Sequence, residues 1–282
     1  MNNRNIHTFI ACDKEYEDSD IVIFGAPFDC TTSYRPGARF APEAIRNESY
    51  GIETYSLYQD KDLEDTNVFD GGDLELPFGN PEPALDMIEK YTEKVIKDGK
   101  LPFMIGGEHL VTLGAVKAAV KKYENLHIIH FDAHADLRQE YLGMTLSHAS
   151  VIRRCHELTG DGRIFQFGIR SGDRQEMAWG SKHVSTCRFN FNKLENVIDS
   201  LRNVPVYFTI DLDILDPSEF PGTGTPEAGG VTYNELITAV EKVLKLNIVG
   251  MDMVELSPTY DHSGISTALA CKLLREILLY LS

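Results

Sequence analysis

The sequence predicts an α/β fold in which helices cover both faces of a mainly parallel sheet. Short apolar runs alternate with segments of helical periodicity along the whole chain. The chain has 282 residues, of which 43% are hydrophobic and 25% charged, as in ordinary globular proteins. Because no low-complexity stretch or Pro/Gly/Ser linker divides the chain, we expect a single domain over residues 1–282.

The first half of the chain contains four predicted strands and three predicted helices. The run 20–25 is apolar and is stopped by Gly25 and Pro27, which indicates a buried strand. A Gly/Pro-bearing loop follows, and Pro42 stands at a position that favours a helix start. Further strands are expected at 68–69, 101–105 and 126–131, and helices from 83 to Gly99 and over 110–120.

The second half continues the alternation. Apolar or β-branched runs predict strands at 163–169, 204–210 and 248–254. Apolar residues at helical spacing predict helices at 147–158, 192–201, 233–244 and 269–278. Connections between parallel strands are right-handed crossovers, so these helices are expected on both faces of the sheet.

Polar clusters follow four of the predicted strands. They are Gly107–His109, Asp132–Asp136, Asp211–Asp213 and Glu255. In open parallel sheets, ligands bind outside the carboxyl ends of the strands. Loops that were merely solvated would scatter such residues over both edges, so their convergence on one edge predicts an active site.

In the segment 130–136, side chains that can bind a metal stand at alternate positions. Asp132, His134 and Asp136 share one face if the segment is extended, and carboxylates with imidazole suit Mn²⁺, Zn²⁺ or Fe²⁺. For this segment alone, an Asp-rich loop that caps the next helix is the competing interpretation. His130 would lie on the same face, but it falls inside the predicted strand, and we interpret it as a core histidine.

The candidate ligands are too many for one metal. They comprise two imidazoles and four carboxylates: His109, His134, Asp132, Asp136, Asp211 and Asp213. A catalytic zinc ion takes three protein ligands, so this set suits two metals instead. The excess of carboxylates and the lack of thiolates favour Mn²⁺ over Zn²⁺, and we predict two Mn²⁺ per subunit.

These motifs together resemble the signatures of the ureohydrolase family, which includes arginase and agmatinase. They run in the same order and spacing over nearly the whole chain: Gly106-Gly107-Glu108-His109, Asp132-Ala133-His134-Ala135-Asp136, Ser147-His148, Asp211-Leu212-Asp213, Pro221–Pro226 and Glu255-Leu256-Ser257-Pro258. Within the family they look most like those of bacterial agmatinases that feed spermidine synthesis. The Asn- and Ser-rich segment with which arginases hold the α-amino and α-carboxylate groups is not evident between Asp136 and His148.

The resemblance implies a three-layer αβα arginase-type fold and specific roles for the ligands. It implies that Asp132 and Asp211 bridge two manganese ions. His109 and Asp136 would complete one metal, and His134 and Asp213 the other. The implied reaction is hydrolysis of agmatine to putrescine and urea by a metal-bridging hydroxide.

Four residues are expected to serve the substrate. Glu255 would hold the guanidinium group by charge-assisted hydrogen bonds. Asp136 would return a proton to the leaving amine, and His148 would be the proton shuttle because its pKa is expected near the operating pH. Asp173 would meet the distal amine at the rim, and a solvated turn residue is the equally weighted alternative.

Charge and composition exclude several classes of partner. The 27 Lys and Arg against 43 Asp and Glu give a net charge of −16, which argues against nucleic acid and anionic membranes and favours a cationic substrate. Scattered cysteines without a Cys-x-x-Cys pair, together with the lack of an apolar leader in Met1–Asp20, predict a cytoplasmic protein. The family resemblance implies a homo-oligomer, a trimer or hexamer.

Other functions remain open at this stage. Guanidinobutyrate, arginine or formimidoylglutamate are alternative substrates, and a cation at the pocket mouth, Arg35, Arg39 or Arg138, would favour guanidinobutyrate. A two-metal phosphoesterase would need a Gly-Asn-His element and further histidines, which the sequence lacks. A non-catalytic binding homologue is disfavoured because all six ligands are present.

Overall fold

The computed structural model describes residues 7–282, and it confirms the mainly parallel sheet. Eight strands form one sheet in the order β4-β1-β5-β10-β9-β6-β7-β8, and every neighbouring pair is parallel. The strands are β1 (Ile21–Ala26), β4 (Val68–Asp73), β5 (Leu101–Gly106), β6 (His127–Phe131), β7 (Ile164–Ile169), β8 (Ser185–Arg188), β9 (Pro205–Asp211) and β10 (Asn247–Val254). The expectation for the chain start lies partly outside the described residues, since these begin at residue 7.

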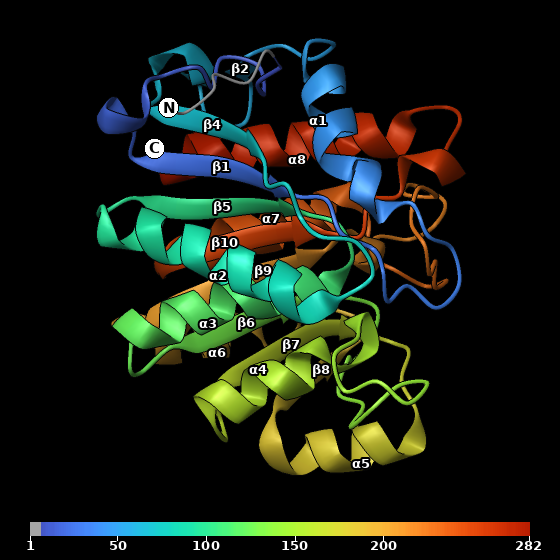
Figure 1. The fold of residues 1–282 in the computed structure, drawn as a ribbon. Helices are drawn as coiled ribbons and strands as arrows, with labels where there is room; N and C mark the ends of the chain where they lie inside the picture. The colour runs from blue at the N-terminus through green and yellow to red at the C-terminus, as the bar shows by residue number, and fades with distance from the viewer. Residues whose placement is uncertain (1–6) are drawn as a thin grey trace.

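Helices cover both faces of the sheet, which gives the three layers (Figure 1). On one face lie α2 (Pro81–Lys97), α3 (Thr112–Lys122), α4 (Val151–Thr159) and α5 (Arg174–His183). On the other face lie α1 (Ala41–Ser49), α6 (Leu194–Leu201), α7 (Tyr233–Val243) and α8 (Ile265–Leu281). Alternation along the strands supplies both cores: Phe103 and Ile105 of β5 face one core and Met104 faces the other.

Two elements of the main fold escape prediction from the sequence, α5 and β8. The helix α5 buries only Glu176 and Gly180, so it carries no apolar stripe of helical period. Its start does have a readable signal, because Asp173 and Glu176 form a reciprocal capping box. A short antiparallel pair, β2 (Tyr55–Ser56) and β3 (Lys61–Asp62), was also not predicted.

The polar clusters follow the four central strands of the sheet, β5, β10, β9 and β6. In the register of the sheet, Val254 pairs with Asp211, and Ile210 pairs with Phe131. The segments that follow these strands therefore leave the sheet side by side. Gly107 permits this crowding, because a Cβ at this position would lie 2.0 Å from the carbonyl oxygen of Phe28.

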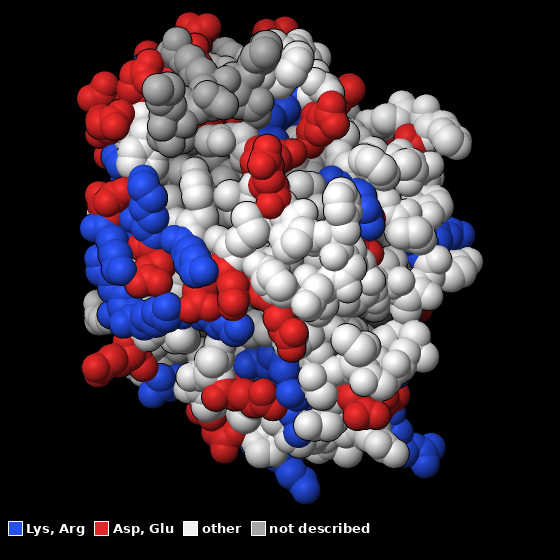
Figure 2. Space-filling model, in the orientation of Figure 1, with Lys and Arg blue, Asp and Glu red and all other residues white. Residues whose placement is uncertain are grey.

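The visible surface carries both signs of charge (Figure 2). The lysines near the ends of α2 and α3 pair with carboxylates: Lys97 with Glu93, and Lys121 with Glu89 and Glu93. This basic group is thus largely neutralised. Among residues 7–282, no helix combines the length and the apolar character needed to cross a bilayer.

Candidate metal centre and active site

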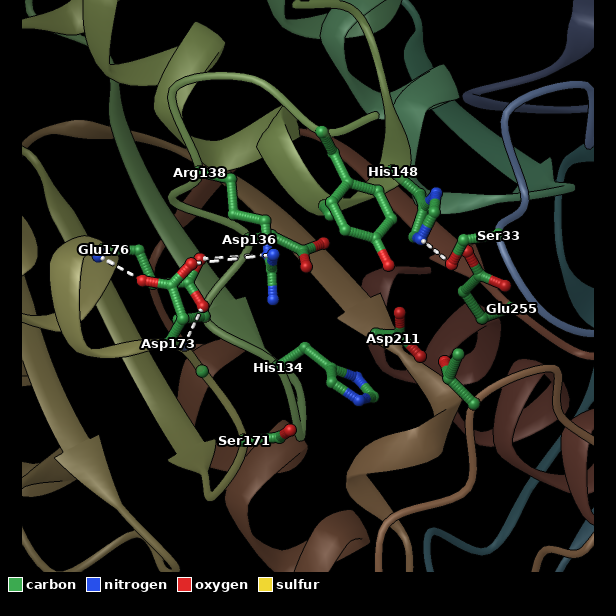
Figure 3. Close-up of a pocket in the computed structure, with 15 residues that line it drawn as sticks. Ser33, His134, Asp136, Arg138, His148, Ser171, Asp173, Glu176, Asp211 and Glu255 are labelled. Carbon is green, nitrogen blue, oxygen red and sulfur yellow. Dashed lines mark hydrogen bonds and ion pairs between the residues drawn. The ribbon is translucent and has the colours of Figure 1, made fainter. Parts of the chain in front are cut away.

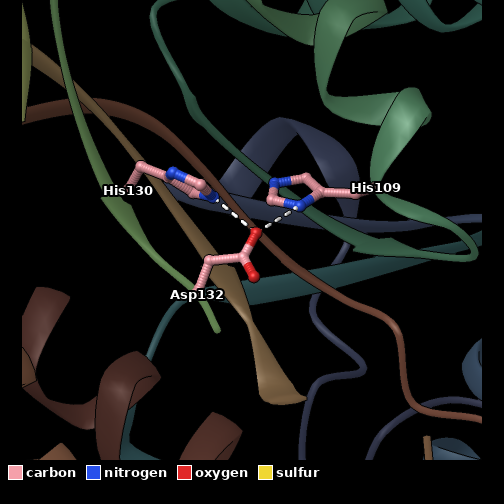
Figure 4. A group of neighbouring side chains, drawn as sticks. All are labelled: His109, His130 and Asp132. Carbon is pink, nitrogen blue, oxygen red and sulfur yellow. Dashed lines mark hydrogen bonds and ion pairs between the residues drawn. The ribbon is translucent and has the colours of Figure 1, made fainter. Parts of the chain in front are cut away.

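His109 lies against three carboxylates at the carboxyl end of β5. Its Nδ1 is 3.1 Å from Oδ2 of Asp132, 3.3 Å from Oδ2 of Asp136 and 3.2 Å from Oδ2 of Asp211. Figure 4 shows the ring of His109 directed at Asp132. Three acceptor oxygens therefore converge on one imidazole nitrogen, in the grouping that the sequence predicts for one metal.

The hydrogen bonds on the other side of His109 determine its tautomer. The Thr209 hydroxyl donates to Oδ1 of Asp252 at 2.5 Å, so its oxygen is left to accept from Nε2 of His109 at 3.0 Å. With the proton on Nε2, Nδ1 is the atom left to face the carboxylates. Burial opposes a charge on the ring, but the contacts with Asp132, Asp136 and Asp211 raise the pKa of His109 well above its usual value. Three carboxylates around one buried nitrogen therefore require a positive charge, which either a second proton on the ring or a bound cation supplies.

His134 forms the second group. Its Nδ1 is 2.9 Å from Oδ2 of Asp213 and 3.6 Å from Oδ1 of Asp132. The other oxygen of Asp213 accepts from the Ala133 amide at 3.1 Å, which orients the carboxylate. Asp132 thus directs one oxygen to His109 and the other to His134, as a bridging ligand would.

Burial and neighbouring carboxylates raise the pKa of two carboxyl groups in the site, whereas imidazoles lower the pKa of a third. Burial, together with the charges of Asp213 and Asp132, raises the pKa of Asp211 well above its usual value. Burial and the charge of Asp132 raise the pKa of Asp136 to about 7. Burial acts against ionisation of Asp132 too, but the neighbouring imidazoles hold the pKa of Asp132 well below its usual value. A carboxylate-rich site of this kind fits a pair of divalent cations, which would offset the repulsion.

His130 is buried inside β6, as the sequence predicts, but it also holds a site residue. Its Nε2 lies 2.7 Å from Oδ2 of Asp132. Gln166 donates to the Ala135 carbonyl at 2.7 Å and contacts Nδ1 of His130 at 3.0 Å, so Nδ1 accepts and Nε2 donates to Asp132. His130 orients Asp132 from behind, and strand alternation alone did not reveal this role.

Arg170 fixes the loop that carries Asp211 and Asp213. Its guanidinium donates to the carbonyls of Asp213 at 2.7 Å, Ile214 at 3.1 Å and Leu215 at 3.2 Å. Because one rigid group binds three successive carbonyls, the loop has little freedom. Nothing in the local sequence indicates these contacts, because they join Arg170 to a segment more than 40 residues further along.

A cavity of about 270 Å³ opens beside the two histidine groups (Figure 3). It brings together most of the predicted site residues, and its lining includes His134, Asp136, His148, Asp173, Asp211 and Glu255. His109, Asp132 and Asp213 lie beneath it and are buried. The assignment of these residues as ligands and catalytic groups stays a prediction.

Glu255 is buried at the inner end of the cavity, directly after β10. One carboxylate oxygen, Oε1, accepts from the His109 amide at 2.7 Å. Burial and the nearby charge of Glu108 raise the pKa of Glu255 well above its usual value. Arg46, a conceivable partner for Glu255, instead binds Asp70 through Nε at 2.8 Å. Glu255 therefore remains available for a cation in the cavity.

His148 lines the cavity from a short 3-10 turn capped by Ser147. Its amide donates to the Thr31 hydroxyl at 3.1 Å, and its Nε2 lies 3.3 Å from the Ser33 hydroxyl. Loss of hydration lowers the pKa of His148 to about 4. The expectation of a pKa near the operating pH is therefore wrong, because the imidazole is too enclosed to stay charged at neutral pH.

The rim of the cavity carries Arg138 between two carboxylates. The guanidinium lies 3.6 Å from Asp173 and 4.0 Å from Glu176. Asp173 caps α5, accepting from the amides of Gln175 at 2.7 Å and Glu176 at 2.9 Å. Two negative charges against one positive leave the rim net negative, although the sequence would associate Arg138 with an anionic tail.

Two cavity residues adopt left-handed backbone conformations that residues other than glycine rarely adopt. The φ angles are 52° at Asp136 and 66° at Glu255. Such conformations cost about 1–3 kcal/mol each and cluster at functional sites. Both carboxylates are aimed into the cavity at the expense of local backbone stability.

Comparisons with known proteins agree with the predicted family and fold. Residues 19–280 match the model of the arginase family. The chain is 48% identical to an agmatinase of Bacillus subtilis over 276 residues, covering 96% of this chain and 95% of the relative. It is 37% identical to the N(1)-aminopropylagmatine ureohydrolase of Thermococcus kodakarensis, covering 92% and 90%.

Solved structures give the same result. The crystal structure of a putative agmatinase from Clostridium difficile superposes with a TM-score of 0.92 at 51% identity, covering 95% of this chain and 99% of that one. The family resemblance read from the sequence motifs is confirmed. This chain belongs to the arginase family.

Proposed function

We propose that the protein is an agmatinase, a metal-dependent hydrolase that converts agmatine to putrescine and urea for polyamine biosynthesis. The observation that carries the proposal is a cavity with an unpaired carboxylate, Glu255, at its inner end and net negative charge at its rim. Agmatine is a linear dication with a guanidinium at one end and an ammonium at the other. The charges of the cavity match both ends.

The metal sites we propose are two Mn²⁺ per chain. His109 and Asp136 would hold one ion, and His134 and Asp213 the other, with Asp132 and Asp211 shared. The convergence of three carboxylates on Nδ1 of His109 and the all-oxygen-and-nitrogen donor set support this assignment. When bound, the pair supplies an activated water and stabilises developing negative charge.

Glu255 would hold the guanidinium in position for attack. The His109 amide fixes Oε1, so the carboxylate cannot turn away from the cavity. An ionised carboxylate forms two parallel hydrogen bonds to a guanidinium, which sets the plane of the group as well as its place. The substrate carbon is thereby presented with one face toward the metal ligands.

Proton transfer would fall to Asp136 and His148. Asp136 lines the cavity, where it would take a proton from the attacking water and return it to the leaving amine. His148 is neutral at pH 7, and its Nδ1 has no hydrogen-bond partner among the described residues. A neutral imidazole of this kind can accept a proton and release it readily to solvent, which is the shuttle role.

The distal ammonium of agmatine would lie at the rim near Asp173. Its Oδ1 is occupied by the amides of α5, but Oδ2 faces Arg138 at 3.6 Å, beyond hydrogen-bond length. An incoming ammonium can share this oxygen. A substrate with a terminal carboxylate would meet Asp173 and Glu176 as repulsive groups, with Arg138 already neutralised.

We also propose that residues 1–282 form a single domain and that the protein acts in the cytoplasm as a homo-oligomer, a trimer or hexamer. The continuous eight-stranded sheet supports the first point. Family resemblance is the support for the oligomer. The net charge of −16 supports the view that neither nucleic acid nor membrane is a partner.

Urea release after Mn²⁺ loading tests the substrate assignment. We expect kcat/KM for agmatine to exceed that for arginine and guanidinobutyrate by at least about 10²-fold, because the carboxylate of either rival meets the acidic rim. Urea is measured at equal concentrations of the three substrates. Equal rates on arginine and agmatine, or none on agmatine, would refute the assignment.

Asp173→Asn separates the rim from the rest of the site. Asparagine keeps the helix cap but removes the charge. We expect KM for agmatine to rise by about 3- to 10-fold with kcat little changed, in keeping with a partly exposed ion pair. An unchanged KM would leave Asp173 with its capping role alone.

His148→Asn should lower kcat about 10²-fold at pH 7.5, with a small effect on KM, if His148 shuttles protons. Full turnover by the variant would exclude the shuttle. Stability provides a second readout in the metal-free protein. Since the folded pKa of His148 is about 4, the unfolded chain binds more protons between pH 4 and the ordinary value near 6.5. The wild type should therefore lose more free energy of unfolding than the variant as pH falls through this window, which denaturant titration measures.

A further inference from the structure

A second group of metal-binding side chains lies away from the cavity, between α4 and α5. His156 of α4, Asp161 of the following loop and His183 of α5 offer ligand atoms that all lie within 4.8 Å of one another. Nε2 of His156 is 2.8 Å from Oδ1 of Asp161, and Nδ1 of His183 is 2.7 Å from the same oxygen. None of the three lines the cavity.

The backbone holds Asp161 between the two histidines. The amide of Gly160 donates to the carbonyl of His156 at 2.7 Å, and the amide of Gly162 donates to the carbonyl of His183 at 3.1 Å. Both glycines have positive φ, 88° and 74°, which lets the loop turn back on each side of the aspartate. Gly160 and Gly162, which flank Asp161, are thus hydrogen-bonded to the backbone of His156 and of His183. These are the two histidines that the carboxylate of Asp161 contacts.

Trp179 orients both rings. Its indole stacks on His183 with a centroid distance of 4.3 Å and meets the edge of His156 at 4.8 Å. The guanidinium of Arg153 covers the indole at 3.6 Å. Ligands whose rotamers are fixed before binding lose less entropy when a metal arrives.

We propose that His156, Asp161 and His183 form a binding site for a transition-metal ion of the Zn²⁺ or Ni²⁺ type, separate from the proposed catalytic pair. Two imidazoles and one carboxylate favour such ions over Ca²⁺ or Mg²⁺. Ligand atoms about 2.1 Å from one ion lie about 3 Å apart at the right angles of octahedral coordination and about 3.4 Å apart at tetrahedral angles, so the contacts of 2.8 Å and 2.7 Å need to open by about 0.2–0.7 Å. The exposed side of Asp161 leaves room for water on the remaining positions.

A metal at this site would join the ends of two helices. His183 is the last residue of α5, and His156 lies in the last turn of α4, where the helix dipole also favours a cation. The opposite end of α5 begins after Asp173 at the cavity rim. A metal bound here would therefore link α5, which begins at the cavity rim, to α4. It would stabilise α5 without occupying the cavity.

The test counts metal ions in the whole, Mn²⁺-loaded protein. Wild type and variants are dialysed against the same low micromolar free Zn²⁺, and the metal content per chain is measured by elemental analysis. We expect wild type to hold one more ion per chain than His183→Ala. His127→Ala, which removes a histidine that bonds only the nearby Asn125 carbonyl among its described contacts, is the matched control and should equal wild type.

Asp161→Asn guards against a folding defect in His183→Ala. Its side chain is largely exposed, so the fold should tolerate the change, and Zn²⁺ affinity at the extra site should fall by at least about 10-fold because the anionic ligand is lost. Both variants should retain urea release. Equal metal content in wild type, His183→Ala and Asp161→Asn would overturn the proposal and leave Asp161 as an ion-pair partner of the two histidines. Neither outcome depends on which substrate the enzyme hydrolyses.

Discussion

Asp211→Asn should abolish turnover, lowering kcat/KM by at least about 10³-fold, and should reduce bound manganese below two ions per chain. Oδ2 of Asp211 lies 3.2 Å from Nδ1 of His109, and Oδ1 accepts at 2.9 Å from the amide of Asp213, the residue whose carboxylate contacts His134. Asparagine keeps the shape but removes the negative charge that the two proposed ions would share. Urea release and elemental analysis measure the two effects.

The same substitution should have the opposite effect on the metal-free fold. The raised pKa of Asp211 means that its ionised form is unfavourable in the folded state. The free energy of unfolding therefore falls as the pH rises above the usual pKa of an aspartate. At neutral pH, the metal-free variant should therefore unfold at a temperature equal to or above that of metal-free wild type. A dimetallic, active variant would contradict the bridging role.

Asp216→Asn is the control for Asp211→Asn, because it alters another acid of the same segment. The carboxylate of Asp216 accepts from the amides of Ser218 at 3.0 Å and Gly229 at 2.9 Å, which fixes the turn. It contacts neither histidine group among the described interactions. We expect Asp216→Asn to lower thermal stability somewhat while keeping two metal ions.

Glu255→Gln should lower kcat/KM for agmatine by about 30- to 5 × 10³-fold with both metal ions retained. Glutamine can still accept from the His109 amide, but it cannot pair with a guanidinium as an anion. Truncating one charge of a buried, hydrogen-bonded pair costs about 2–5 kcal/mol, which corresponds to this range. Steady-state kinetics with elemental analysis separates this loss from that of Asp211→Asn.

The retained metal content is what makes the Glu255 test specific. A variant that lost both metal and activity would show that Glu255 supports the His109 loop instead of the substrate. Unchanged kcat/KM with two ions bound would remove Glu255 from guanidinium recognition altogether.

The sheet and the polar residues at the carboxyl ends of its strands could be predicted because their sequence signals are local. Continuous apolar runs identify the buried strands, and the polar residues directly after them are read from the same stretch of sequence. The helix α5 was missed because its one-sided burial involves Glu176 and Gly180 instead of an apolar stripe. Its capping box was the available signal.

The supporting contacts could not be predicted because they join distant parts of the chain. His130 orients Asp132 only when Gln166, 36 positions away, fixes its tautomer. Arg170 reaches carbonyls 43 to 45 residues further along. The lowered pKa of His148 likewise follows from its burial in the folded protein, which the neighbouring sequence does not indicate.

The strand order β5-β10-β9-β6 at the centre of the sheet has a consequence for how the protein folds. The residues after these four strands are up to 146 positions apart, as His109 and Glu255 are, so the centre combines contacts of very high sequence separation. Closing such long loops is slow and comes late. A nascent or cleaved chain that lacks β10 would have His109 without Glu255, and one that lacks β9 would have neither Asp211 nor Asp213. All six proposed metal ligands precede β10, so capture of the metal pair would require β9, and a released fragment that ends before β9 would lack two of the six ligands.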